Sequence, residues 1–192
     1  AAGDSGTSTA DFTLAGASQS WSVSVVEGGT WLVDDRGPGD VEFATALAAA
    51  GDVLAVGAAA ENSWDDGEIL IFRRSGAGAP YAREAAFSHT AGNGDDDTFG
   101  ETVAAAAGGD AVAATKIERY YGGAFVFTAA DGFTSATALT PPTSIYYDDY
   151  GEALAAGGDL IVVGEPGGDA TDTDYGEAHV FRRQGDGSWA FE

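Results

Sequence analysis

The feature that most constrains the fold of this chain is a unit of sequence that occurs three times. Each copy opens with an aromatic residue and a run of small residues, in "FATALAAA" from Phe43, "FGETVAAAA" from Phe99 and "YGEALAAG" from Tyr150. A turn and a second short apolar run follow, in "GDVLAVGA", "GDAVAATK" and "GDLIVVGE". The three aromatic residues are 56 and 51 residues apart. This spacing indicates a chain built from copies of one supersecondary unit.

Each unit contains four candidate strands. The third strand is supplied by "GEILIF", "GGAFVF" and "GEAHVF", and an aromatic residue after a polar turn opens the fourth: Tyr81, Phe133 and Trp189. Four strands in about 50 residues are typical of one blade of a β-propeller. The alanine-rich runs favour a helix by propensity. The equivalent run of the third unit is "LIVVG", which is short and β-branched, so we predict strands throughout.

The N-terminal part resembles an incomplete fourth unit. "ADFTLAG" places Asp11 and Gly16 at the five-residue spacing that separates the turn aspartate from a later glycine in "GDVLAVG". One interpretation is a partial blade that lacks its first strand, and the other is an unrelated extension. We predict an all-β propeller of four-stranded antiparallel blades. The expected order is a flexible segment at 1–7, the partial blade or extension at 8–42, and blades at 43–98, 99–149 and 150–192.

The phrases "FGETVAAAAGGD", "YGEALAAGGDLIVVGEP" and "GEAHVFRRQGDGSWAFE" resemble FG-GAP repeats. This resemblance covers about residues 43–192 well and 8–42 loosely. It implies a propeller at the cell surface or outside the cell that serves adhesion or partner binding, often with calcium. Calcium-binding members carry a D-x-D-x-D-G loop between the first two strands of a blade. Here that link is only "AAGD" or "AGGD", so the resemblance does not supply a calcium site.

The charge of the chain is strongly negative, with 31 acidic and 8 basic residues and a net charge of −23. Such a chain repels nucleic acids and anionic membranes. Two interpretations of the charge remain open: a solvated surface, as in proteins from salty or extracellular settings, and specific cation binding. No cysteine is present, which excludes disulfides. The first residue is not methionine, so we expect a secreted chain whose signal peptide has been removed.

Most of the acidic residues fall in loops that the alternation of strands places on one face of the propeller. Three interpretations are open for these loops: solvated turns, Ca²⁺ binding through clustered carboxylates, and docking of a basic partner. "DATDTD" is the strongest candidate for a single ion site. The candidate metal ligands are Asp65, Asp66, Asp95, Asp96, Asp97, Asp169, Asp172 and Asp174.

The opposite face of the predicted propeller receives Arg73, Arg74, Arg182 and Arg183, at the ends of two third strands. An acidic face opposite an arginine rim permits head-to-tail stacking of identical subunits. The acidic side also carries exposed aromatic candidates, which suit glycan or protein binding. These are Trp64, Tyr146 and Tyr147. Tyr150 is the equivalent of Phe99, and we expect it to be buried.

Catalytic motifs are missing from the sequence, and we predict no enzyme and no catalytic residues. No nucleophile elbow, zinc signature or phosphate loop is present. His179 aligns with Leu70 and Phe125 in a third strand, which favours a packed strand position over a ligand. Paired carboxylates also occur in glycoside hydrolases, but the acidic pairs here are too numerous to single out one, so a hydrolase is the weakest hypothesis.

Three blades and part of a fourth do not suffice for a closed ring, because propellers typically have four or more complete blades. Three outcomes are possible. The N-terminal segment could fold back and close a small ring, or a neighbouring subunit could complete the structure by strand addition. The third is that the chain belongs to a longer propeller. We favour the last two. The leading hypothesis is a structural or adhesive subunit that self-associates into a multimer or filament. The alternative is a calcium- or carbohydrate-binding module.

Overall fold

The computed structural model describes residues 8–13, 20–26, 29–33, 41–60, 67–88, 98–117, 122–142, 149–168 and 176–192. Within these ranges the regular structure consists of β-strands and two short 3₁₀ turns, η1 (Ala107–Gly109) and η2 (Ala129–Asp131). The predicted all-β class is therefore confirmed. No helix in the described ranges is long and apolar enough to cross a membrane.

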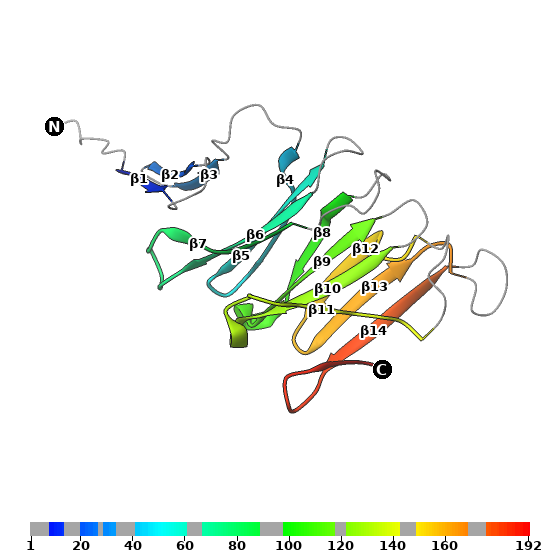
Figure 1. The fold of residues 1–192 in the computed structure, drawn as a ribbon. Helices are drawn as coiled ribbons and strands as arrows, with labels where there is room; N and C mark the ends of the chain where they lie inside the picture. The colour runs from blue at the N-terminus through cyan, green and yellow to red at the C-terminus, as the bar shows by residue number, and fades with distance from the viewer. Residues whose placement is uncertain are drawn as a thin grey trace.

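The strands form four antiparallel sheets in which chain neighbours pair (Figure 1). The N-terminal sheet holds β1 (Ser8–Thr13), β2 (Ser20–Val26) and β3 (Gly29–Val33). The first sheet holds β4 (Val41–Ala50), β5 (Val53–Ala60), β6 (Glu68–Arg74) and β7 (Tyr81–Ser88). The second sheet holds β8 (Thr98–Ala105), β9 (Ala111–Ile117), β10 (Gly123–Thr128) and β11 (Ala136–Ala138). The third sheet holds β12 (Ala153–Gly157), β13 (Leu160–Glu165), β14 (Glu177–Arg183) and β15 (Trp189–Phe191).

The three four-stranded sheets have the architecture of consecutive propeller blades. One hydrogen bond repeats in each of them and fixes the equivalence of the repeats. The backbone carbonyl of the turn aspartate accepts from an amide at the end of the third strand, in the pairs Arg74–Asp52, Ala129–Asp110 and Arg183–Asp159, at 2.8–3.0 Å. Ring closure is not detected in the described part of the chain.

The core lies between neighbouring sheets rather than inside any one of them. The second sheet is buried on both faces because it has a neighbour on each side, and residues 111–116 of β9 are buried without interruption. Val112 and Ala114 face the first sheet, whereas Ala111 and Ala113 face the third. The small side chains of this strand let the sheets approach closely. This explains the alanine-rich runs that have helical propensity in isolation.

Two details differ from the sequence prediction. Asp11 lies inside β1 and pairs with Ser22, so it is not a turn aspartate; tertiary pairing outweighs the spacing on which that alignment rested. Phe133 does not open the fourth strand of the second sheet, which begins only at Ala136. Phe133 instead follows η2 with a positive φ of 55° and is fully buried. A buried aromatic anchor in a turn replaces the first residues of that strand.

Candidate functional site

The contacts that join the sheets come from the aromatic-glycine pairs seen in the sequence. Phe99 and Tyr150 are almost fully buried, which confirms the prediction for Tyr150. The glycine that precedes the third strand of one sheet lies against the aromatic residue of the next. A Cβ on Gly67 would lie 2.0 Å from the Phe99 carbonyl oxygen, and a Cβ on Gly122 would lie 1.6 Å from that of Tyr150. These positions admit only glycine, because any larger residue would overlap backbone.

The second residue of each pair needs a left-handed backbone. Gly100 has a φ of 84° and Gly151 a φ of 103°, a region that glycine enters at little cost. The equivalent of these glycines in the first sheet is Ala44, with a φ of 66°. The pairing register shifts just after the aromatic residue in both β4 and β8. The aromatic-glycine signature therefore encodes a bulged strand start that docks on the preceding sheet.

Each sheet has two faces that take different roles. We call the face that points toward the next sheet along the chain the forward face, and the opposite face the rear face. The forward face of the first sheet contains Val53, Ala55, Ile69 and Ile71, each 0% exposed. The forward face of the second sheet contains Ala111, Ala113, Ala124 and Val126, which are 1–2% exposed. Both faces are buried because the next sheet covers them.

The forward face of the third sheet is open. The positions equivalent to the buried ones are Leu160, Val162, Ala178 and Val180, which are half-buried or exposed. Ala153 and Ala155 of β12 are exposed on the same face. In Figure 1 this sheet forms one end of the stack. None of the described sheets covers this face as the next sheet covers the equivalent residues of the first and second sheets.

The other end of the stack is also partly open. Val56, Leu70 and Phe72 on the rear face of the first sheet are buried. Leu47 on the same face, opposite Val56 in β4, is 67% exposed. Its equivalent in the second sheet, Val103, is only 9% exposed. Leu47 lies in β4, the first strand of this sheet.

The four arginines predicted to bind a partner already have partners within the chain. Arg73 Nε donates to Glu84 and Arg74 Nε to Asp52, each at 2.6 Å. Arg182 makes a two-point contact with Glu192 at 3.0 and 3.1 Å. Arg183 lies 3.5 Å from Asp110 of the second sheet.

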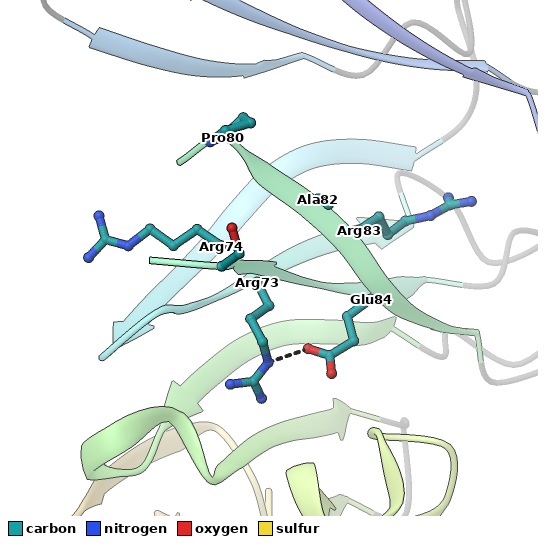
Figure 2. Close-up of a pocket in the computed structure, with 7 residues that line it drawn as sticks. Arg73, Arg74, Pro80, Ala82, Arg83 and Glu84 are labelled. Atoms are coloured by element: carbon teal, nitrogen blue, oxygen red, sulfur yellow. Dashed lines mark hydrogen bonds and ion pairs between the residues drawn. The ribbon is translucent and has the colours of Figure 1, made fainter. Parts of the chain in front are cut away.

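A shallow hollow of about 460 Å³ lies beside two of these arginines (Figure 2). Its lining residues are Arg73, Arg74, Ser75, Pro80, Ala82, Arg83 and Glu84. In Figure 2 the Arg73 side chain turns toward Glu84, whereas Arg74 and Arg83 point away from each other. The hollow thus gathers basic side chains in a very acidic chain, but they do not converge on one point.

One buried polar cluster lies on the rear face of the third sheet. Glu165, Glu177 and His179 each present one ligand atom, and these atoms lie within 4.8 Å of one another. His179 is 3% exposed in β14, which confirms the predicted packed strand position. Its Nε2 makes a hydrogen bond with Glu165 Oε2 and lies 3.6 Å from Glu177 Oε2. Burial, and to a smaller extent the negative charge of Glu165, raises the pKa of Tyr150 above its usual range.

The links between the first and second strands of the blades do not fit the calcium loop of the family. They are tight turns at Gly51–Asp52, η1–Asp110 and Gly158–Asp159. The Asp52 carboxylate is bound to Arg74, and Asp110 lies beside Arg183. Within these described turns no group of three carboxylates converges on one position.

The remaining predicted site residues lie outside the described residues. These are the loop candidates Asp65, Asp66, Asp95, Asp96, Asp97, Asp169, Asp172 and Asp174, together with Trp64, Tyr146 and Tyr147. The Glu165–Glu177–His179 cluster was not among the predicted metal ligands. The repeat alignment carried a signal for it, because pairing the second and third strands places the two glutamates opposite each other.

A family model described as FG-GAP repeat matches residues 133–181. Over this segment the chain is similar to the FG-GAP repeat family. The segment starts at Phe133 before β11 and ends at Phe181 in β14, so it spans the junction of the second and third sheets and contains the Tyr150–Gly151 pair. FG-GAP modules are typically binding or adhesion propellers, are generally non-catalytic and often bind Ca²⁺. No curated protein gives a significant match to the chain.

Proposed function

We propose that this chain is a non-catalytic structural or adhesion module, located outside the cell or at its surface, that assembles head to tail with further copies of itself. The observation that carries this proposal is the open forward face of the third sheet. Its residues hold positions that are buried between blades twice elsewhere in the chain. A surface built to be covered, yet left open, favours a role in assembly.

The partner that fits this face best is the other end of a second copy. Forward and rear faces pack against each other at both junctions within the chain. The forward face of the third sheet and part of the rear face of the first sheet, at Leu47, are open, and these two sheets lie on either side of the second sheet in Figure 1. Joining an open forward face to an open rear face is a heterologous contact, which repeats into a ring or a filament.

The distribution of charge also supports an apolar contact at this face. The chain has 31 acidic residues, yet the strand positions on the open forward face carry a single charged pair, Arg182 with Glu192. The other positions are small or aliphatic. They are Ala153, Ala155, Gly157, Leu160, Val162, Gly164, Ala178, Val180 and Ala190. Apart from Glu192, which is paired with Arg182, no acidic residue occupies these described strand positions, so electrostatic repulsion opposes a contact less here than at the acidic loops.

The test is the molar mass in solution by light scattering, at high salt to screen the net charge. We expect a mass that rises with concentration above the 19.3 kDa of one chain. The double variant Val162→Glu and Val180→Glu should return the mass to one chain, because it buries two carboxylates in any contact there. Thr137→Glu in β11, an exposed strand residue, adds one negative charge away from this face and should leave assembly intact.

Two results would defeat the assembly proposal. A wild-type chain that remains at 19.3 kDa at all concentrations would leave the open face to another partner, such as a basic protein or a glycan. Assembly that survives both glutamate substitutions would mean that the contact lies elsewhere, for example at the arginine hollow.

The second candidate function is calcium binding, favoured by the acidic loops of the sequence and by the frequent binding of Ca²⁺ by FG-GAP repeats. Binding to the folded state alone raises the melting temperature. An increase with Ca²⁺ that an equal concentration of Mg²⁺ does not reproduce would support this function. Identical melting with Ca²⁺, Mg²⁺ and chelator would exclude it.

A further inference from the structure

We propose that Glu165, Glu177 and His179 form a binding site for a divalent transition-metal ion of the Zn²⁺ class. The site lies on the rear face of the third sheet, between this sheet and the second. It is separate from the open forward face, so its test is independent of the proposed assembly.

The strand register brings the three side chains together. Glu165 in β13 pairs directly with Glu177 in β14, and His179 pairs with Val163 one step further along the same face. The Glu165 side chain is 1% exposed, that of His179 4% and that of Glu177 19%. Two ligands are thus fixed by burial in strands, while the third lies at the rim, where an ion can enter.

The loop after β13 holds the rim ligand in place. The Gly168 amide donates to the Glu165 carbonyl at 3.0 Å. A Cβ on Gly168 would lie 2.8 Å from Glu177 Cγ, so this backbone packs directly against the Glu177 side chain. A site whose ligands are positioned before binding loses less conformational entropy when the ion arrives.

Comparison of the blades shows that this chemistry is particular to the third sheet. The position of Glu165 is occupied by Ala58 in the first sheet, and the position of His179 by Leu70; both are 0% exposed. In the second sheet the same positions hold Lys116, which is 7% exposed, and Phe125, so the apolar pair is a feature of the first sheet and neither sheet has a carboxylate or an imidazole there. The third sheet carries a carboxylate and an imidazole instead, which bind each other, and the imidazole lies beside the rings of Tyr150 and Phe191.

Electrostatics favour a divalent cation between the glutamates. Like charges at directly opposed strand positions destabilise a sheet, and burial strengthens their repulsion. An ion bound by both carboxylates converts this repulsion into two attractive contacts.

The donor set distinguishes the class of ion. Ca²⁺ and Mg²⁺ take oxygen ligands, whereas imidazole nitrogen together with carboxylate oxygen suits Zn²⁺ and its first-row neighbours. With metal–ligand bonds of about 2.0–2.2 Å, tetrahedral ligand atoms lie about 3.4 Å apart. The distance of 3.6 Å between His179 Nε2 and Glu177 Oε2 fits this spacing. Glu165 must separate slightly from His179, and Nε2 must bind in its deprotonated form.

The experiment is a calorimetric titration of the full metal-free chain with ZnCl₂ in a large excess of MgCl₂, which occupies exposed carboxylates. We expect one Zn²⁺ per chain. Glu177→Gln at the rim should weaken binding by at least about tenfold. Because single changes at buried positions risk the fold, the double variant Glu165→Ala and His179→Leu restores the apolar pair of the first sheet. It should fold as the wild type does and lose the site.

The matched control is Glu68→Gln, because Glu68 pairs with Ala58 in the first sheet as Glu177 pairs with Glu165 in the third. This variant should bind Zn²⁺ like the wild type. The proposal is overturned if the wild type binds no Zn²⁺ in excess Mg²⁺. It is also overturned if Glu177→Gln and the double variant both retain wild-type affinity, since the ion would then be held elsewhere.

Discussion

The contact between Gly122 and Tyr150 offers the most direct test of how the blades are joined. Gly122 precedes β10, and an added Cβ would lie 1.6 Å from the Tyr150 carbonyl oxygen and 2.5 Å from its carbonyl carbon. These atoms belong to the backbone of the neighbouring sheet, so no rotamer change relieves the overlap. Gly122→Ala therefore requires the second and third sheets to move apart by more than 1 Å, on the order of the overlap itself.

The expected cost follows from the way overpacked cores respond. An inserted methyl group typically destabilises by about 1–3 kcal/mol, and by more where the surroundings cannot relax. Because backbone opposes backbone here, we expect about 3 kcal/mol. For a chain of this size each kcal/mol lowers the melting temperature by about 2–4 °C, which gives a decrease of about 6–12 °C.

Thermal melting followed by circular dichroism measures the effect, with Gly185→Ala as control. Gly185 has no atom of another residue within 4 Å of the added Cβ and no positive φ, so alanine there should be neutral or slightly stabilising. If Gly122→Ala and Gly185→Ala melt at the same temperature, the close approach of Gly122 to Tyr150 does not hold the sheets together.

Four further predictions rest on other features of the chain. Ala44 has a φ of 66° and an exposed side chain, so its left-handed backbone is strained. Ala44→Gly should raise the free energy of unfolding, measured by chemical denaturation, by about 1 kcal/mol. A lower free energy of unfolding would contradict this strain at Ala44. Tyr150→Phe should lower the free energy of unfolding by about 1–3 kcal/mol, since the buried Leu139 carbonyl loses the hydroxyl that donates to it at 2.7 Å. The pKa of Tyr150 is raised in the folded state, so the tyrosine of the unfolded state loses its proton first as pH rises. The free energy of unfolding should therefore fall above about pH 10. Urea titrations should show this fall in the wild type and less of it in Tyr150→Phe. Added NaCl should raise the melting temperature, because it screens the repulsion among the acidic residues of a chain whose net charge is −23. An unchanged melting temperature would show that this repulsion is negligible.

The architecture could be predicted from the sequence because the repeats allow equivalent positions of different blades to be compared. Aligning the turn aspartates identified equivalent positions, and the hydrogen bonds Arg74–Asp52 and Arg183–Asp159 confirm that alignment. The comparison failed where only one copy was informative. Asp11 matched the spacing but lies within β1, because strand pairing and not local spacing decides its position.

The candidate sites were harder to predict because their residues meet only after the strands pair. Glu165 and Glu177 are separated by a loop along the chain but lie directly opposite each other in the sheet. Similarly, the sequence predicted that Arg73 and Arg182 bind a partner, but it did not reveal that Arg73 pairs with Glu84 in β7 and Arg182 with Glu192 just after β15. Composition gives the charge of the chain; the strand register decides which charges neutralise each other.

The net charge also bears on how assembly would be controlled. Two copies that join bring −23 each toward one another, and this repulsion is long-ranged at low salt but falls off within about 8 Å at physiological ionic strength. The attraction between the open faces is apolar and acts only in contact. Low salt therefore opposes assembly, whereas high salt weakens the repulsion and leaves the apolar term intact. Such a module would remain monomeric in dilute salt and would assemble as ionic strength rises. Docking by ion pairs has the opposite salt dependence, because salt weakens it. The molar mass measured across a range of salt concentrations therefore distinguishes apolar assembly from docking by ion pairs.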